Sequence, residues 1–201
     1  MNSFDESWAL AWSDLNLQPP GQLLAHLLAA YQEPQRHYHS QQHLVECLTH
    51  FAEVREQALH PGEVSLALWF HDAIYDVKGK SNEQQSADWA VSALSAAGAG
   101  QTTRNRVHQL IMATKHDALV VEPDQQLLVD IDLAILGASA ERFAEYDEQV
   151  RAEYSWVPGV VYNMKRKAVL KAFLARDFIY STPHFRQCFE ERARSNLAAV
   201  V

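Results

Sequence analysis

The stretch LWFHDAIYD, residues 68–76, sets a histidine and an aspartate inside a run of large apolar side chains. His71 and Asp72 follow Leu-Trp-Phe and precede Ala-Ile-Tyr, which predicts that the pair is buried. A carboxylate is almost never fully buried without a partner, because an unpaired buried charge destabilises the fold. Two interpretations are open: an aspartate at a helix end beside a core histidine, or a pair that binds a cation.

The sequence on both sides of this stretch has the apolar periodicity of helices. Glycine and proline, seven of each, cluster where segments meet, and between them apolar residues recur at i, i+3, i+4 and i+7. Asn-Gly hairpin turns and sustained period-two strands are missing from the sequence. We therefore predict a single-domain, all-α helical bundle, with helices over 21–31, 40–59, 62–75, 81–98, 102–117, 124–136, 139–154, 159–179 and 183–198.

Composition narrows the classes of function. The 201 residues carry a formal charge of −8, which is unlike the basic face of a nucleic-acid binder. Two cysteines are too few for a disulfide framework and indicate free thiols in a reducing compartment. The N-terminal residues lack the basic and apolar regions of a signal peptide, and no stretch approaches the roughly 20 apolar residues of a membrane span. We expect a cytoplasmic protein without nucleic-acid or membrane partners.

Two further stretches contain residues that bind metals. In RHYHSQQHL, residues 36–44, His39 and His43 are four apart, so a helix would place both on one face. Two surface histidines are the alternative. In LLVDIDLAILG, residues 127–137, Asp130 and Asp132 lie in the most apolar segment and need partners. Because they are two apart, they point in different directions on a helix, and we expect only one to join a site; the alternative is that one or both cap a helix start.

The order of these motifs resembles the HD-domain superfamily of metal-dependent phosphohydrolases. The resemblance rests on His43, on His71-Asp72 and on the Asp130/Asp132 pair, and it extends to YHSQQHL, WFHDAIYD, SNEQQSA, ATKH, DIDLAILGA and VRAEYSWVP. It covers roughly residues 30–180. It implies a helical bundle whose central divalent ion (Mn, Fe, Co, Zn or Mg) is held by these four positions.

The last ligand departs from the family pattern. In many HD proteins this aspartate follows a small residue, whereas here Val129 and Ile131 precede the two candidates. The residues after Asp132 match the pattern better, so Asp132 is preferred and Asp130 is kept as the alternative.

Seven residues are candidates for catalysis or substrate binding. The Tyr-His pair that ends at His39 is similar to the cyclic-nucleotide phosphodiesterase branch, which implies a general acid. The alternative for His39 is to orient water. Glu83 either positions the attacking water or caps a helix N-terminus. Lys115, His116 and Arg151 are candidates for contacts with phosphate, with Arg36 and Arg166 as weaker ones and solvated surface groups as the alternative.

Together these motifs predict an enzyme. The expected reaction is hydrolysis of a phosphoester or phosphoanhydride in a nucleotide-like small molecule, with the metal activating the attacking water. Two alternatives are a non-catalytic sensor that binds metal and nucleotide, and a metal-free helical interaction module.

Overall fold

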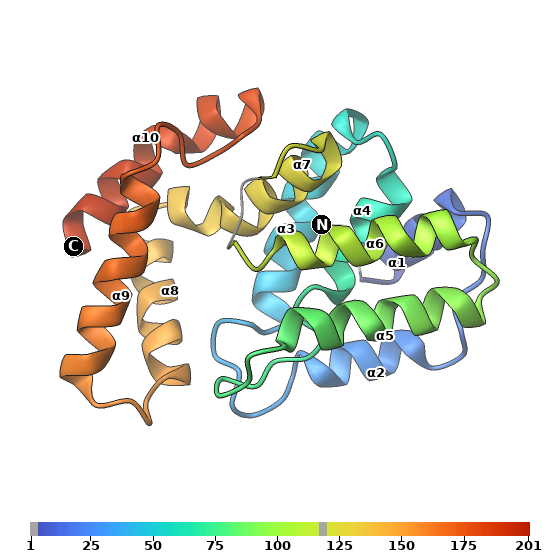
Figure 1. Cartoon of the computed structure of the whole chain (residues 1–201), viewed down its shortest axis with the longest axis horizontal. Helices are drawn as coiled ribbons and strands as arrows, with labels where there is room; N and C mark the ends of the chain where they lie inside the picture. The colour runs from blue at the N-terminus through green and yellow to red at the C-terminus, as the bar shows by residue number, and fades with distance from the viewer. Residues whose placement is uncertain (1–3, 117–119) are drawn as a thin grey trace. The chain divides into compact units, whose positions relative to one another are not determined.

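The described part of the chain, residues 4–116 and 120–201 of a computed structural model, is helical and contains no strand (Figure 1). The all-α prediction is therefore confirmed. Its helices are α1 (Phe4–Asp14), α2 (Leu23–Ala30), α3 (Gln41–Val54), α4 (Pro61–Phe70), α5 (Asn82–Ala96), α6 (Gln101–Ala113), α7 (Pro123–Asp132), α8 (Ala140–Glu153), α9 (Gly159–Leu174) and α10 (Pro183–Val200), with short 3-10 helices η1 (Arg55–Gln57) and η2 (Leu133–Gly137).

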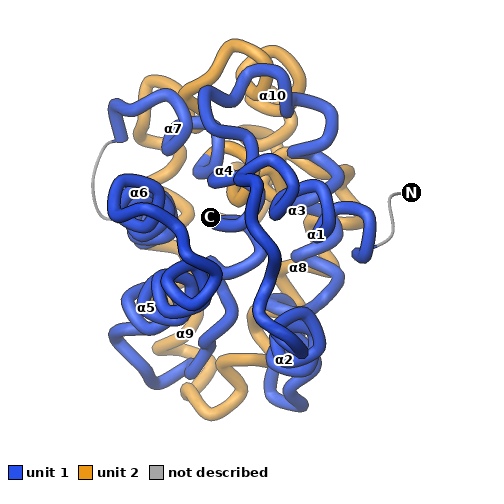
Figure 2. Tube along the Cα trace, turned by 90° about the vertical axis from the view of Figure 1, so that its right-hand side faces the viewer, with its two compact units in different colours: residues 1–129 blue, residues 130–201 orange. Residues whose placement is uncertain are grey.

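The chain forms two compact units (Figure 2). Unit 1 is Met1–Val129 and unit 2 is Asp130–Val201. Helix α7 contains the boundary, so that Asp130 and Asp132 are counted in unit 2. The single-domain organisation stays a prediction.

Helix α4 is the centre of unit 1. It begins with Pro61 in its first turn, where a proline loses no helical hydrogen bond, and every residue from Gly62 to Phe70 is buried. A helix that is apolar all round needs neighbours on every side, and α4 contacts α1, α3, α5 and α6. The core of unit 1 therefore surrounds the helix that leads into the His-Asp pair.

Helix α1 was not predicted from the sequence. It buries Trp8, Ala11 and Trp12, and the Trp8 ring meets Trp69 of α4 edge-on at 5.1 Å between centroids. This long-range contact adds to the apolar spacing of the segment itself, in which Phe4, Trp8, Ala11 and Trp12 recur at i, i+4, i+7 and i+8. None of the described helices combines the length and the apolar character that a membrane crossing requires.

Several predicted helices end earlier than expected, and the end of α4 determines where the His-Asp pair lies. The segment predicted to be helical over 62–75 leaves the helix after Phe70, so His71 is the residue at the C-cap and Asp72 lies in the following turn. The segment predicted over 40–59 ends at Val54. The predicted end at residue 117 lies outside the described residues.

Unit 2 is built from η2, α8, α9 and α10. Helix α10 buries Phe185, Ala193 and Leu197 and packs against η2. A side chain at Gly137 would come within 2.7 Å of the backbone oxygen of Phe189, so this glycine permits the close approach of the two elements.

Candidate metal centre

Three side-chain atoms of unit 1 converge in a buried place between the start of α3 and the end of α4. His43 Nε2 lies 3.1 Å from His71 Nε2 and 3.5 Å from Asp72 Oδ2, and His71 Nε2 lies 3.1 Å from the same carboxylate oxygen. Both histidines are almost completely buried, with exposed fractions of 2% and 1%. The structure thus brings together three of the residues that the sequence predicted as ligands.

The spacing of these atoms fits the ligands of one metal ion. Nitrogen and oxygen ligands bind zinc at about 2.0–2.2 Å, so two ligands of one ion lie about 2.8–3.6 Å apart for angles between a right angle and the tetrahedral one. All three separations fall in this range. Two imidazoles and a carboxylate are also a donor set that divalent transition ions accept.

A hydrogen bond to the backbone sets the tautomer of His71. Its Nδ1 lies 2.8 Å from the carbonyl oxygen of Leu68. A carbonyl only accepts, so Nδ1 carries the proton and Nε2 presents its lone pair to His43 and Asp72. Such a backbone contact is the usual way in which a ligating histidine is oriented. A lone pair that faces a second imidazole nitrogen at 3.1 Å needs a hydrogen or a metal ion between them, supplied either by an Nε2–H group of His43 or by a bound ion.

The neighbouring imidazoles keep Asp72 ionised. Burial opposes its ionisation, but His71, His39 and His43 outweigh burial when their rings are protonated, and they then hold the pKa of this carboxyl well below its usual range. The turn that carries Asp72 is anchored by Tyr31, whose hydroxyl accepts the Asp72 N–H at 3.3 Å and donates to the carbonyl of Trp69 at 3.2 Å. Asp72 is thus a fixed, negatively charged acceptor.

Arg36 holds the backbone around the site, which corrects its prediction as a phosphate contact. Its Nη1 donates to the carbonyls of His39 at 3.1 Å and of Asp72 at 2.6 Å, and its Nη2 donates to the carbonyl of Ala73 at 2.9 Å. Its Nε pairs with Glu33 at 3.0 Å. The guanidinium is buried and joins the two turns that carry His39 and Asp72, so its hydrogen bonds are used by the protein itself.

Cys47 is a neighbour of the site that the sequence analysis missed. The ligand atoms of His43, Cys47 and His71 lie within 4.8 Å of one another, so these residues are of a kind and spacing that could hold a metal ion. Its position four residues after His43 was the available signal. The sulfur lies 3.7 Å from each ring nitrogen of His43. Cys47 is therefore a further candidate ligand beside the three converging atoms.

His39 lies near the site, but not for the predicted reason. Helix α3 begins at Gln41, so His39 sits in the preceding turn and does not share a helix face with His43. Its ring stacks on Tyr75 at 4.0 Å between centroids and lies 6.1 Å from the His43 ring. The ring is half-buried. His39 therefore lies beside His43 but outside the group of converging atoms.

The two aspartates of α7 have different surroundings. Asp130 is fully buried in unit 2, and its two oxygens accept the N–H groups of Ser181 at 2.8 Å and Thr182 at 2.6 Å, just before α10. Burial raises the pKa of Asp130, and these backbone donors partly oppose the rise. Asp130 thus serves the N-terminus of α10. Asp132 ends α7 and is only partly buried, and it stays the predicted fourth ligand.

The other predicted site residues lie on other elements. Glu83 is half-buried in the first turn of α5. Lys115 and His116 follow the end of α6. Arg151, in unit 2, donates to the carbonyls of Tyr154 and Val157 at 2.6 and 3.3 Å, and Arg166 of the same unit pairs with Asp147. Their roles in substrate binding or catalysis stay predictions.

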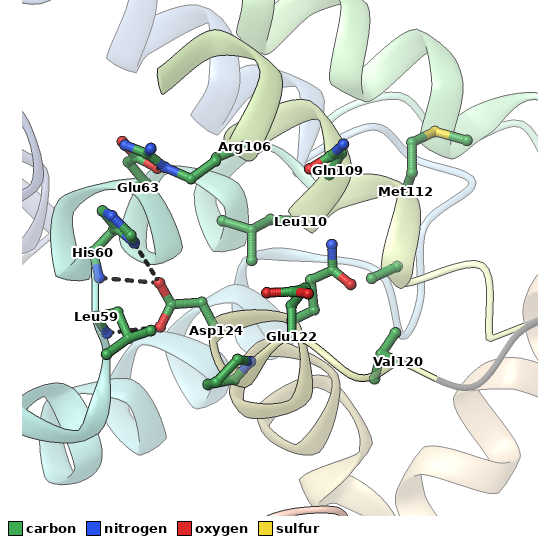
Figure 3. Close-up of a pocket in the computed structure, with 13 residues that line it drawn as sticks. Leu59, His60, Glu63, Arg106, Gln109, Leu110, Met112, Val120, Glu122 and Asp124 are labelled. Carbon is green, nitrogen blue, oxygen red and sulfur yellow. Dashed lines mark hydrogen bonds and ion pairs between the residues drawn. The ribbon is translucent and has the colours of Figure 1, made fainter. Parts of the chain in front are cut away.

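Unit 1 also has a pocket of about 540 Å³ that the sequence did not predict (Figure 3). Four of its polar side chains, Asp124, His60, Arg106 and Glu63, form two pairs. Asp124 accepts the N–H groups of Leu59 and His60 at 2.7 and 3.0 Å and contacts His60 Nδ1 at 3.0 Å, while Arg106 binds Glu63 through two nitrogens. These contacts hold the N-terminus of α4 to α6 and α7. None of the three converging atoms belongs to this pocket.

Comparisons with protein-family models, with curated proteins and with solved structures find no match. The functional assignment therefore rests on the chemistry and spacing of the residues themselves.

Proposed function

We propose that the chain is an HD-type metal-dependent phosphohydrolase that acts on a phosphoester or phosphoanhydride of a nucleotide-like small molecule. The observation that carries this proposal is the buried triangle of His43 Nε2, His71 Nε2 and Asp72 Oδ2, with sides of 3.1–3.5 Å. An all-helical fold with these three groups at the ends of two helices is compatible with the HD type. The motif order along the sequence supports the same assignment.

His43, His71 and Asp72 would hold the ion, and Asp132 is the proposed fourth ligand. Imidazoles favour a transition ion over magnesium, so manganese, iron, cobalt and zinc are the first metals to test. When bound, such an ion lowers the pKa of a coordinated water and polarises a phosphoryl oxygen. The backbone bond to His71 Nδ1 and the contacts of Arg36 orient these ligands before any ion binds.

Residues around the triangle are proposed to donate a proton, to orient the attacking water and to contact the substrate. His39 is close enough to Asp72 to affect the pKa of that carboxyl, and its imidazole is suited to donate a proton to the leaving oxygen near neutral pH. Tyr75 fixes the plane of its ring by stacking. Glu83 is proposed to orient the attacking water, and Lys115, His116 and Arg151 to contact the negative charge of the substrate.

A non-catalytic sensor of metal and nucleotide is the alternative. Such a protein needs the ligands but has no use for a proton donor beside them. Turnover therefore separates the two functions: a sensor binds the nucleotide and the metal without releasing product, and replacing His39 leaves its nucleotide affinity unchanged.

The test combines metal analysis with a substrate screen. Elemental analysis of the purified protein, reconstituted with each metal, should show bound metal in wild type and strong loss in His71→Ala and Asp72→Asn. His26→Ala, an exposed histidine of α2, is the matched control and should keep the metal. Nucleotides and model phosphoesters are then screened with each metal. A wild-type protein that neither binds metal nor gains stability from it would refute the proposal.

A further inference from the structure

Helix α9 carries apolar side chains on the side that it does not bury. Towards its own unit it buries Tyr162, Leu170 and Phe173. The opposite side exposes Val160 by 84% and Met164 by 66%. Clustered exposed apolar groups usually mark an interaction surface, whereas scattered ones do not.

The spacing of the exposed residues suits the packing of another helix. Val160, Met164, Ala168 and Ala172 follow one another at intervals of four, and all four are exposed. Such a row forms a ridge along a helix, and ridges of this type pack into the grooves of a neighbouring helix. The two alanines leave room for a close approach. We call the side of α9 that contains these four residues the outer face.

Lysines border the outer face. Lys165, Lys167 and Lys171 are exposed, and α9 contains no acidic residue. The remaining cation of this helix, Arg166, already pairs with Asp147 of α8 at 3.0 Å. A partner that covers the outer face should therefore bring carboxylates to both edges of its apolar centre.

The neighbouring helix α8 has the complementary surface. Figure 1 shows α8 and α9 side by side, joined by the short connection after Glu153, and the Arg151 guanidinium lies 4.7 Å from the centre of the Tyr162 ring. Helix α8 has five acidic and two basic side chains. Glu141, Glu145 and Glu148 are exposed, together with the small Ala144.

We propose that the outer face of α9 binds helix α8 of a second copy of the chain. In a two-fold symmetric dimer the same contact forms twice, α9 on the partner's α8 and α8 on the partner's α9, which gives a four-helix arrangement. Pairing α9 with α9 would instead place lysines against lysines, and pairing α8 with α8 would place glutamates against glutamates. Charge complementarity thus selects the mixed pairing. This proposal does not depend on the metal centre.

The first experiment measures mass in solution. Size-exclusion chromatography with light scattering should give twice the 22.8 kDa of the chain for wild type. Val160→Glu should raise the dissociation constant of the dimer more than about tenfold, because it puts a charge into the apolar centre. The matched control is Val121→Glu, a valine of unit 1 with a similar exposed fraction of 76%, which should leave the dimer intact.

The second experiment exchanges charges and tests the mixed pairing itself. One variant carries Lys165→Glu and Lys171→Glu, and the other carries Glu141→Lys and Glu148→Lys. Each should be monomeric alone, because α9 and the facing α8 then have the same sign. An equimolar mixture should restore a heterodimer, since both contacts are again between opposite charges. Circular dichroism confirms that each variant is folded.

Several outcomes would overturn the proposal. A monomeric wild type at the highest soluble concentration would do so, and a monomeric wild type that sediments with phosphatidylserine vesicles would assign the outer face to a membrane surface instead. Equal effects of Val160→Glu and Val121→Glu, or a charge-exchanged mixture that stays monomeric, would show that the dimer uses another surface.

Discussion

Replacing Asp130 should destabilise the protein while leaving its metal content unchanged. The carboxylate is fully buried and accepts the backbone N–H groups of Ser181 and Thr182 at 2.8 and 2.6 Å. Alanine at this position leaves both donors without their acceptor at the start of α10. The sequence alone kept Asp130 as an alternative metal ligand, so the same variant also decides between Asp130 and Asp132.

The magnitude follows from the two hydrogen bonds. A bond to a charged group contributes about 1.5–3 kcal/mol, which gives about 3–6 kcal/mol for the pair. Burial raises the pKa of Asp130, which means that ionising this carboxyl in the folded protein is unfavourable, and alanine removes that penalty. We therefore expect a net loss near the lower end, about 3 kcal/mol. For a chain of this size that corresponds to a fall of about 6–12 °C in Tm.

The assay is thermal unfolding with a chelator present, followed by elemental analysis of the metal-loaded protein. Asp130→Asn keeps one carbonyl oxygen as an acceptor and should lose about half as much stability. Asp132→Ala is the matched comparison on the same helix: we expect it to lose metal and activity with a much smaller change in the Tm of the metal-free protein.

Two outcomes would contradict the roles given to Asp130 and Asp132. If Asp130→Ala unfolds at the wild-type temperature and loses its metal, while Asp132→Ala keeps the metal, the two assignments are reversed. If both variants keep the metal, the proposed fourth ligand is wrong and the ion is held within unit 1.

Three further predictions concern the surroundings of the triangle. Arg36→Lys should lower the free energy of unfolding by about 2 kcal/mol and weaken metal affinity about 10–100-fold, because one ammonium cannot reach the three carbonyls. Denaturant unfolding measures the first effect and metal titration the second. A variant with wild-type metal affinity would contradict the orienting role of Arg36. Cys47→Ser should keep the metal, because His43, His71 and Asp72 still supply three converging ligand atoms; a thiolate charge-transfer band in the cobalt-substituted wild type that disappears with the substitution would show that Cys47 is a ligand as well. His39→Ala should keep the metal and lose about 10²–10⁴-fold in kcat on substrates with poor leaving groups, and loss of metal would instead make His39 a ligand.

Local patterns in the sequence were enough to predict the helices and three members of the site. Apolar periodicity depends on neighbours along one helix, so the segments that became α2 to α10 could be located, although their ends were misplaced by a few residues. The burial of His71 and the partial burial of Asp72 were predictable because their apolar neighbours are adjacent in the chain. The need of a buried carboxylate for a partner then pointed to a cation.

The tertiary structure alone decided which residues far apart in the sequence contact one another. Helix α1 was not predicted although Phe4, Trp8, Ala11 and Trp12 have helical spacing, and only the fold shows that Trp8 packs on Trp69 of α4. In the sequence Arg36 cannot be distinguished from a surface arginine. In the fold its guanidinium donates to the carbonyls of His39, Asp72 and Ala73. Asp130 and Asp132 are equivalent as letters, and only the approach of the segment before α10 commits Asp130 to backbone donors. Helical spacing fixes the direction of a side chain, but its partner is set by which other segment folds against it.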